Sequence, residues 1–173
     1  MNTRKITVGG LLIAMSILLP QAFHLMGSPQ MGQILLPMHL PVLLSGFILG
    51  PIFGLFLGIV APLLSSLIAN MPPPHILPFM VLELAGYGFA SGLLYKMLGK
   101  NKYGIIITLI IALIFGRLIY AITIFVAANL LHISDLGVIV VINATIKGVY
   151  GIIAQLIIIP PLIYALRKSE RLD

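Results

Sequence analysis

Long apolar segments recur along this chain, and they restrict its fold more than any other feature. A run of about 18 or more apolar residues has the length that crosses a bilayer as a helix. Of the 173 residues, 60% are hydrophobic and only 8% are charged, whereas about a quarter of the residues in a soluble domain are charged. Too little polar surface is available to cover a water-soluble domain. The sequence therefore predicts an all-α membrane protein that forms one domain over residues 1–173.

Turn-rich segments divide the apolar sequence into six expected transmembrane helices, which we expect to form a compact bundle. The dividing segments are GSPQMGQ, GP, NMPPPH, GKNK and HISDLG, and their glycine, proline and short polar residues are typical of turns. The expected helices run from Ile6 to His24, Ile34 to Gly50, Pro51 to Asn70, Leu77 to Leu98, Tyr103 to Leu131 and Val138 to Leu166. The second contains Pro37 and Pro41, each of which removes a backbone donor, so we expect it to be bent and packed inside the bundle.

The basic residues beside these spans orient the bundle. With six spans and a cytoplasmic N-terminus, the three outer loops contain no Lys or Arg. The cytoplasmic side then holds Arg4, Lys5, Lys96, Lys100, Lys102, Arg167, Lys168 and Arg171. The positive-inside rule therefore predicts that the N- and C-termini are both cytoplasmic. The same placement argues that the net charge of +6 reflects membrane topology and not a nucleic-acid partner.

Motifs for the common catalytic sites are missing from the sequence. The chain has no cysteine, no GxxxxGK[ST] phosphate loop, no HExxH zinc motif and no GxSxG elbow. We therefore expect neither an enzyme nor a metal site, and we expect no cofactor bound to this chain.

Three charged residues, Glu83, Arg117 and Lys147, lie inside expected helices and away from their ends. An unpaired charge at membrane depth costs several kcal/mol unless it meets a partner or a wet cavity. At a rise of about 1.5 Å per residue, Glu83 and Lys147 lie roughly 9 and 14 Å below the outer surface. Arg117 enters from the inside and lies roughly 20 Å along a core of about 30 Å. All three therefore belong to the outer half of the bilayer, where we expect them to line a cavity open to the outside.

Further polar residues share this outer layer. Tyr87 follows Glu83 by four positions, Tyr120 follows Arg117 by three, and Asn143 precedes Lys147 by four, so each pair shares a helix face. With His39, these are the residues that we predict to bind a ligand. Structural roles stand as alternatives: an ion pair for Glu83, a cap on a freed carbonyl for His39, a contact between helices for Asn143, and packing for the tyrosines.

Small residues four positions apart let helix backbones approach closely in a membrane. Gly46 and Gly50, Gly54 and Gly58, and Gly88 and Gly92 have this spacing, which indicates packing within the bundle. Gly10 and Ala14 in the first helix have it as well, and they form a candidate patch for an outside partner.

Taken in order, the segments PMHLPVLLSGFILGPIFGLFLGIVAPLLSSL, MPPP, ELAGYGFASGLLY, GRLIYAI and KGVYGIIAQLIIIPPLIYAL resemble the substrate-binding S component of energy-coupling factor (ECF) vitamin transporters. The resemblance covers nearly the whole chain. It implies a six-helix protein of the bacterial cell membrane that captures a vitamin or its precursor from the outside. It also implies docking on a transmembrane coupling protein and two ATPase subunits, which hydrolyse the ATP. Gly10 and Ala14 match the family's docking patch, and the loop around Gly27 and Gly32 matches its lid.

The resemblance leaves the vitamin open. Two intramembrane cations, Arg117 and Lys147, would suit a carboxylate and favour pantothenate. Glu83 and His39 with the tyrosines would suit pyridoxine or hydroxymethylpyrimidine. A different class of protein, a structural six-helix membrane protein of the cell-shape machinery, would bind no ligand and would use Glu83 only in a buried ion pair.

Overall fold

The computed structural model describes residues 3–26, 32, 34–98, 101–130 and 137–168, and within these ranges it contains six helices and no strand. They are α1 (Thr3–Met26), α3 (His39–Leu49), α4 (Pro51–Ala69), α5 (Leu77–Leu98), α6 (Lys102–Leu130) and α7 (Val138–Lys168). Apart from α3, each has the length and apolar composition of a membrane span. The predicted all-helical membrane fold is therefore confirmed.

The second expected helix is the one clear error in the expected boundaries. Instead of a single helix from Ile34 to Gly50, the chain breaks at Leu36, which has a φ of 48°, and α3 begins only at His39. Pro37 explains the break, because a proline disfavours the helical conformation of the residue before it. Pro41 causes no kink, because it occupies the first turn of α3, where backbone N–H groups have no partner within the helix.

The shortened helix occupies the interior of the bundle. At about 1.5 Å per residue, the 11 residues of α3 reach only about 16 Å, which is too short to cross a bilayer. Nearly all of α3 is buried, and it packs against α1, α4, α5 and α7. The Leu36 carbonyl at the break accepts a 3.5 Å hydrogen bond from Gln155 Nε2 on α7, which partly satisfies the freed backbone.

Glycine contacts join α3, α4 and α5 at the centre of the bundle. A Cβ atom added to Gly88 would lie 3.0 Å from Gly54 Cα, and one added to Gly58 would lie 2.6 Å from Ala85 Cα. The backbones of α4 and α5 are thus close enough that even an alanine would collide, as small residues at membrane helix interfaces allow. Gly50 has a different role from the one expected. Its φ of 96° forms the turn between α3 and α4.

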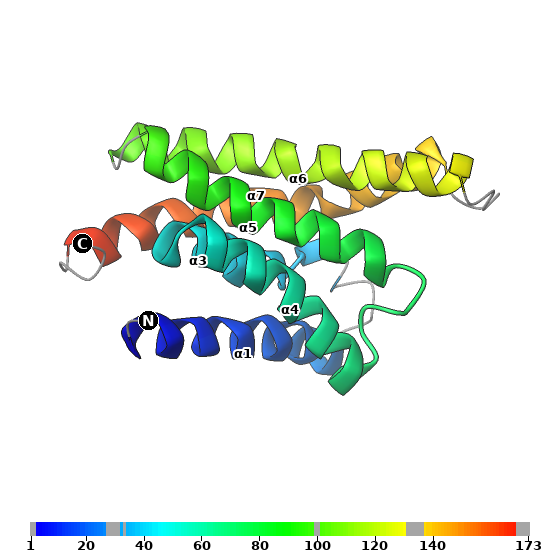
Figure 1. The fold of residues 1–173 in the computed structure, drawn as a ribbon, viewed down its shortest axis with the longest axis horizontal. Helices are drawn as coiled ribbons and strands as arrows, with labels where there is room; N and C mark the ends of the chain where they lie inside the picture. The colour runs from blue at the N-terminus through cyan, green and yellow to red at the C-terminus, as the bar shows by residue number, and fades with distance from the viewer. Residues whose placement is uncertain (1–2, 27–31, 33, 99–100, 131–136, 169–173) are drawn as a thin grey trace.

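The ends of the helices divide into two groups. The N-terminal end of α1, the C-terminal end of α5, the N-terminal end of α6 and the C-terminal end of α7 lie at one end of the bundle (Figure 1). At this end Lys5 lies over the Phe53 ring and Lys102 over the Tyr164 ring. The link between α4 and α5 and the start of α7 lie at the opposite end (Figure 1). The described basic residues that flank the spans therefore share one end.

The outer surface of the bundle is apolar. Large hydrophobic side chains such as Ile52, Leu67, Phe125 and Ile157 are more than half exposed on three different helices. A protein in water rarely exposes apolar patches of this extent, whereas lipid tails contact such side chains without cost. The buried interior is also mainly apolar, with Leu43, Leu84, Leu109 and Ile159 fully enclosed.

Candidate functional site: a polar cavity at one end of the bundle

A cavity of about 530 Å³ is lined by the α4–α5 link and the first turns of α7. These segments lie at the end of the bundle opposite the basic residues that flank the spans (Figure 1). Each of α1, α3, α5, α6 and α7 contributes to its wall, as do the links before α3 and α5. Its lining residues are Pro20, Gly32, Leu36, Pro37, Met38, His39, Met71, Pro72, Pro73, Ile76, Met80, Glu83, Arg117, Tyr120, Val140, Asn143, Ala144 and Lys147. A cavity of this size is typical of small-molecule sites.

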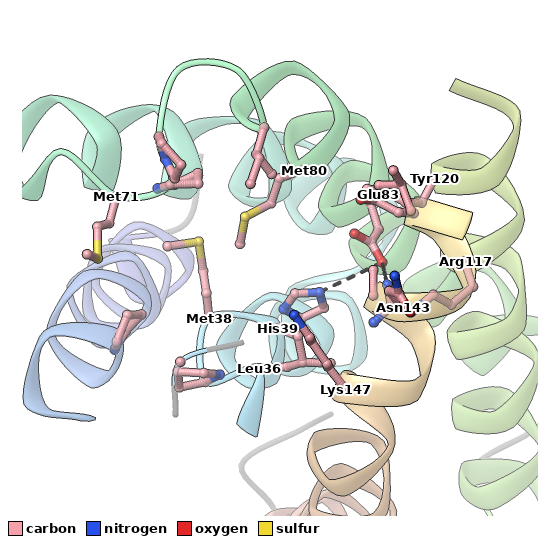
Figure 2. Close-up of a pocket in the computed structure, with 18 residues that line it drawn as sticks. Leu36, Met38, His39, Met71, Met80, Glu83, Arg117, Tyr120, Asn143 and Lys147 are labelled. Carbon is pink, nitrogen blue, oxygen red and sulfur yellow. Dashed lines mark ion pairs between the residues drawn. The ribbon is translucent and has the colours of Figure 1, made fainter. Parts of the chain in front are cut away.

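Six of the seven side chains that the sequence singled out as ligand-binding line this one cavity (Figure 2). They are His39, Glu83, Arg117, Tyr120, Asn143 and Lys147. Four different helices carry them, so the expected gathering of polar groups from separate spans is present. Their contact with a ligand stays a prediction.

Glu83 is the centre of the polar wall, and it is 4% exposed. Its Oε1 atom lies 3.0 Å from Arg117 Nη1 and accepts a 3.1 Å hydrogen bond from the Tyr87 hydroxyl. His39 Nε2 lies 3.9 Å from the same oxygen. The ion pair predicted as an alternative for Glu83 is therefore formed, and its partner is Arg117. Because the pair still borders the cavity, a structural role and a ligand-binding role are compatible.

Tyr87 differs from the position expected for it. It is fully buried behind Glu83 and is absent from the cavity wall. Its ring occupies the space left by Gly116 on α6, where a Cβ atom would collide with the ring. Tyr87 therefore orients the Glu83 carboxylate and does not face the cavity itself.

Arg117 is held by its surroundings as well as by Glu83. Its Nη2 atom lies 2.8 Å from the position of a Cβ atom on Gly148, so the glycine on α7 leaves room for the guanidinium. The Arg117 guanidinium also lies 5.8 Å from the Tyr120 ring centroid, within the range of a cation–π contact. These contacts fix the guanidinium beside the cavity.

His39 is the first residue of α3, and it is 3% exposed. Neither of its ring nitrogens has a hydrogen-bond partner within the described part of the chain. Its ring lies 5.3 Å from the Tyr87 ring. The His39 side chain does not cap the carbonyl freed at the break, the alternative role considered for it. That Leu36 carbonyl accepts hydrogen bonds from the backbone N–H of His39 at 3.0 Å and from Gln155 Nε2 at 3.5 Å. A buried imidazole without partners at a cavity wall is suited to bind an added group.

Asn143 and Lys147 form the α7 side of the wall, one turn apart and exposed. No ion pair joins Lys147 to another described residue. Glu83 is also the only acidic residue among the described ranges. The cavity thus combines one paired cation with one whose charge no described side chain balances.

The sequence did not indicate the apolar wall. Met38, Met71 and Met80 lie across the cavity from the polar side chains (Figure 2), and Pro20, Pro37, Pro72 and Pro73 contribute to it as well. Methionine is common in apolar spans, so no single position gave a signal. The MPPP segment was assigned to a turn, and its place in the cavity follows only from the packing of the α4–α5 link.

The remaining histidines and the expected lid segment contribute little to the described cavity wall. His75 is exposed in the link before α5 and does not line the cavity. The side chain of His24, together with His132 and Gly27, lies outside the described residues, and of the expected lid segment only Gly32 is seen in the wall. Within the described ranges no group of three or more potential metal ligands occurs.

The fold and the site define a multi-pass membrane protein with a polar cavity at one end of its helical bundle. The chain belongs to the family of substrate-specific components of ECF transporters, whose family model matches residues 4–163. Neither the curated proteins nor the solved structures contain a match. Members of this family are transport subunits and not enzymes, so the expectation of a non-enzymatic protein is confirmed. Membership also favours the S component over a structural protein of the cell-shape machinery.

Proposed function

We propose that this S component captures a water-soluble vitamin or vitamin precursor from outside the cell for ATP-driven uptake. The observation that carries the proposal is the meeting of Glu83, Arg117 and Lys147, from three helices, around one cavity of about 530 Å³. Ionisable groups at membrane depth are costly, so they are retained where they face a partner or a polar cargo. The binding domain comprises residues 1–173.

The proposed orientation places the cavity at the outer face of a bacterial cell membrane. The basic residues that flank the spans support this orientation. They share the end of the bundle where α1 begins and α7 ends, and Lys and Arg favour the cytoplasmic side of a membrane. The cavity lies at the opposite end and would then open to the exterior.

The energy for uptake would come from partner subunits: a transmembrane coupling protein and two ATPases that hydrolyse ATP. Gly10 and Ala14 on α1 are the proposed docking residues, and both are exposed. A Cβ atom on Gly10 would meet no heavy atom within 4 Å. This patch of the α1 surface is therefore open for the close approach of another helix.

Pantothenate is the first candidate for the vitamin, and pyridoxine or hydroxymethylpyrimidine comes next. Because Arg117 is paired with Glu83, the argument for a carboxylate depends on Lys147. The argument for a hydroxylated heteroaromatic ring depends on the two ring nitrogens of His39, which form no hydrogen bond within the described residues. They would accept hydrogen bonds from ring substituents or donate hydrogen bonds to them.

Native mass spectrometry of the gently purified protein tests the proposal, because a tightly held vitamin is expected to co-purify. Calorimetric titration with the water-soluble vitamins then measures the affinity, which we expect to be nanomolar to micromolar without ATP. A protein that carries no small molecule and gives no heat with any of these vitamins would not be a vitamin-capture subunit.

A further inference from the structure

The two sides of the cavity differ in chemistry, and the difference restricts what can fill it. One side holds the charged and hydrogen-bonding groups of Glu83, Arg117, Asn143 and Lys147, and the other holds three methionine side chains (Figure 2). A ligand that occupies the whole cavity must therefore be polar at one end and apolar or polarizable at the other.

The charges on the polar side do not balance. Arg117 is neutralised by Glu83 at 3.0 Å, and the glycine gaps at Gly116 and Gly148 hold the Tyr87 ring and the guanidinium in place. To move Arg117 onto a ligand would leave the buried Glu83 carboxylate unpaired, which is unfavourable. Lys147 also lines the cavity, and no described acidic side chain pairs with it. Its ammonium group is therefore available to pair with a ligand.

The position of Lys147 suits this role. It follows Asn143 by one turn on α7, so an ammonium and a carboxamide stand side by side on the cavity wall. Such a pair supplies two kinds of donor to an anionic oxygen, and hydrogen bonds to charged groups are stronger than neutral ones. One unbalanced cation matches one negative charge, which disfavours a phosphate ester that carries two.

The opposite side suits a flat or flexible apolar group. Met38, Met71 and Met80 come from three separate segments, and proline rings surround them. Thioethers adapt to irregular shapes and make favourable contacts with aromatic ring edges. This side contributes contact area without fixing a direction, so the orientation of the ligand is set from the charged side.

We propose that Lys147 is the anion anchor of the cavity, assisted by Asn143, and that the ligand is a small monocarboxylate whose apolar or heteroaromatic body lies against Met38, Met71 and Met80. This inference rests on the proposed function and specifies its substrate class. Arg117 is then a positioning residue. Its guanidinium holds the Glu83 carboxylate in place and completes the polar wall, and its charge is neutralised by Glu83. His39, whose ring nitrogens form no hydrogen bond to a described residue, binds a polar group between the two ends of the ligand.

Matched ligand pairs test the anchor directly. Pantothenate and pantothenol differ in one carboxylate against an alcohol, and nicotinate and nicotinamide differ in a carboxylate against an amide. Titration of the purified full-length protein should show that the acid of at least one pair binds about ten- to one-hundred-fold more tightly than its uncharged counterpart, the range expected for a charge-assisted hydrogen bond. Lys147→Met should abolish this preference, and Lys147→Arg should retain most of it.

Lys96→Met is the matched control, because Lys96 is an exposed lysine in the last turn of α5 that does not line the cavity. It should leave both affinities unchanged. Equal binding of acid and uncharged analogue, or a preference that survives in Lys147→Met, overturns the anchor. If both pairs fail to bind but pyridoxine, thiamine or hydroxymethylpyrimidine binds, the substrate class is wrong while the capture function stands. If no vitamin binds at all, the proposed function falls as well.

Discussion

Arg117 on α6 and Glu83 on α5 form an ion pair of 3.0 Å inside the membrane-spanning region, with side-chain exposures of only 14% and 5%. A buried pair of this kind adds little net stability to the fold, because the attraction between the two charges is offset by the cost of removing both from water. The pair is therefore better understood through its position at the cavity wall than as a device that stabilises the bundle.

Removal of one charge should destabilise the protein much more than removal of both. Arg117→Met leaves the Glu83 carboxylate buried without its cation, and we expect a loss of about 3–5 kcal/mol in the free energy of unfolding. The double variant Glu83→Gln, Arg117→Met should recover most of this loss. Unfolding in mild detergent, followed by circular dichroism, measures both. A double variant as unstable as Arg117→Met would show that packing of the guanidinium, and not its charge, is what matters.

Tyr87→Phe removes a single hydrogen bond and keeps the ring that fills the space beside Gly116. The hydroxyl donates to Glu83 Oε1 at 3.1 Å, so its loss should cost about 1 kcal/mol of unfolding free energy. Tyr150→Phe is the control, because Tyr150 is 67% exposed on α7 and should tolerate the change. The two variants are compared by their thermal unfolding in the same detergent. Equal melting temperatures would mean that the Tyr87 hydroxyl does not hold the carboxylate.

The contact between α4 and α5 should not tolerate even a methyl group. In Gly88→Ala the new Cβ atom would meet the backbone of Gly54, with the Gly54 Cα at 3.0 Å, and overpacking of this kind typically costs about 1–3 kcal/mol. Gly10→Ala is the matched control on α1, where the same atom meets nothing within 4 Å. We expect the control to unfold like the parent. If Gly88→Ala does so too, the two backbones can separate without cost.

A larger side chain on the exposed α1 patch should separate capture from uptake. Gly10→Leu and Ala14→Leu should leave vitamin binding intact, because neither residue lines the cavity. They should block uptake by preventing the coupling protein from approaching. Transport into cells that express the full complex measures uptake, and titration of the purified variants measures binding. Ala165→Leu, on an exposed position of α7, should affect neither. Normal uptake in both α1 variants would place the docking surface elsewhere.

The sequence predicted the spans well where hydrophobicity and turn residues alone decide them. α5 has the expected bounds, and α4 and α7 begin where expected. The second helix was predicted wrongly because the segment from Ile34 to Leu49 is predominantly apolar, while the break at Leu36 depends on local backbone sterics before Pro37. The Leu36 carbonyl accepts a local hydrogen bond from the His39 backbone N–H and a second, longer one from Gln155, and no local pattern reveals the contact with Gln155.

By itself the sequence determined that this chain is a membrane bundle and that Glu83, Arg117 and Lys147 need polar surroundings, because a lone charge in a run of apolar residues is costly wherever the helix lies. Only the tertiary structure decided which charges pair. Arg117 reaches Glu83 across the α5–α6 contact, whereas Lys147 has no described acidic partner. The pairing depends on how the helices are rotated and on the space that glycines leave between helices distant in sequence. The same packing places Tyr87 behind the cavity and the methionines within its wall.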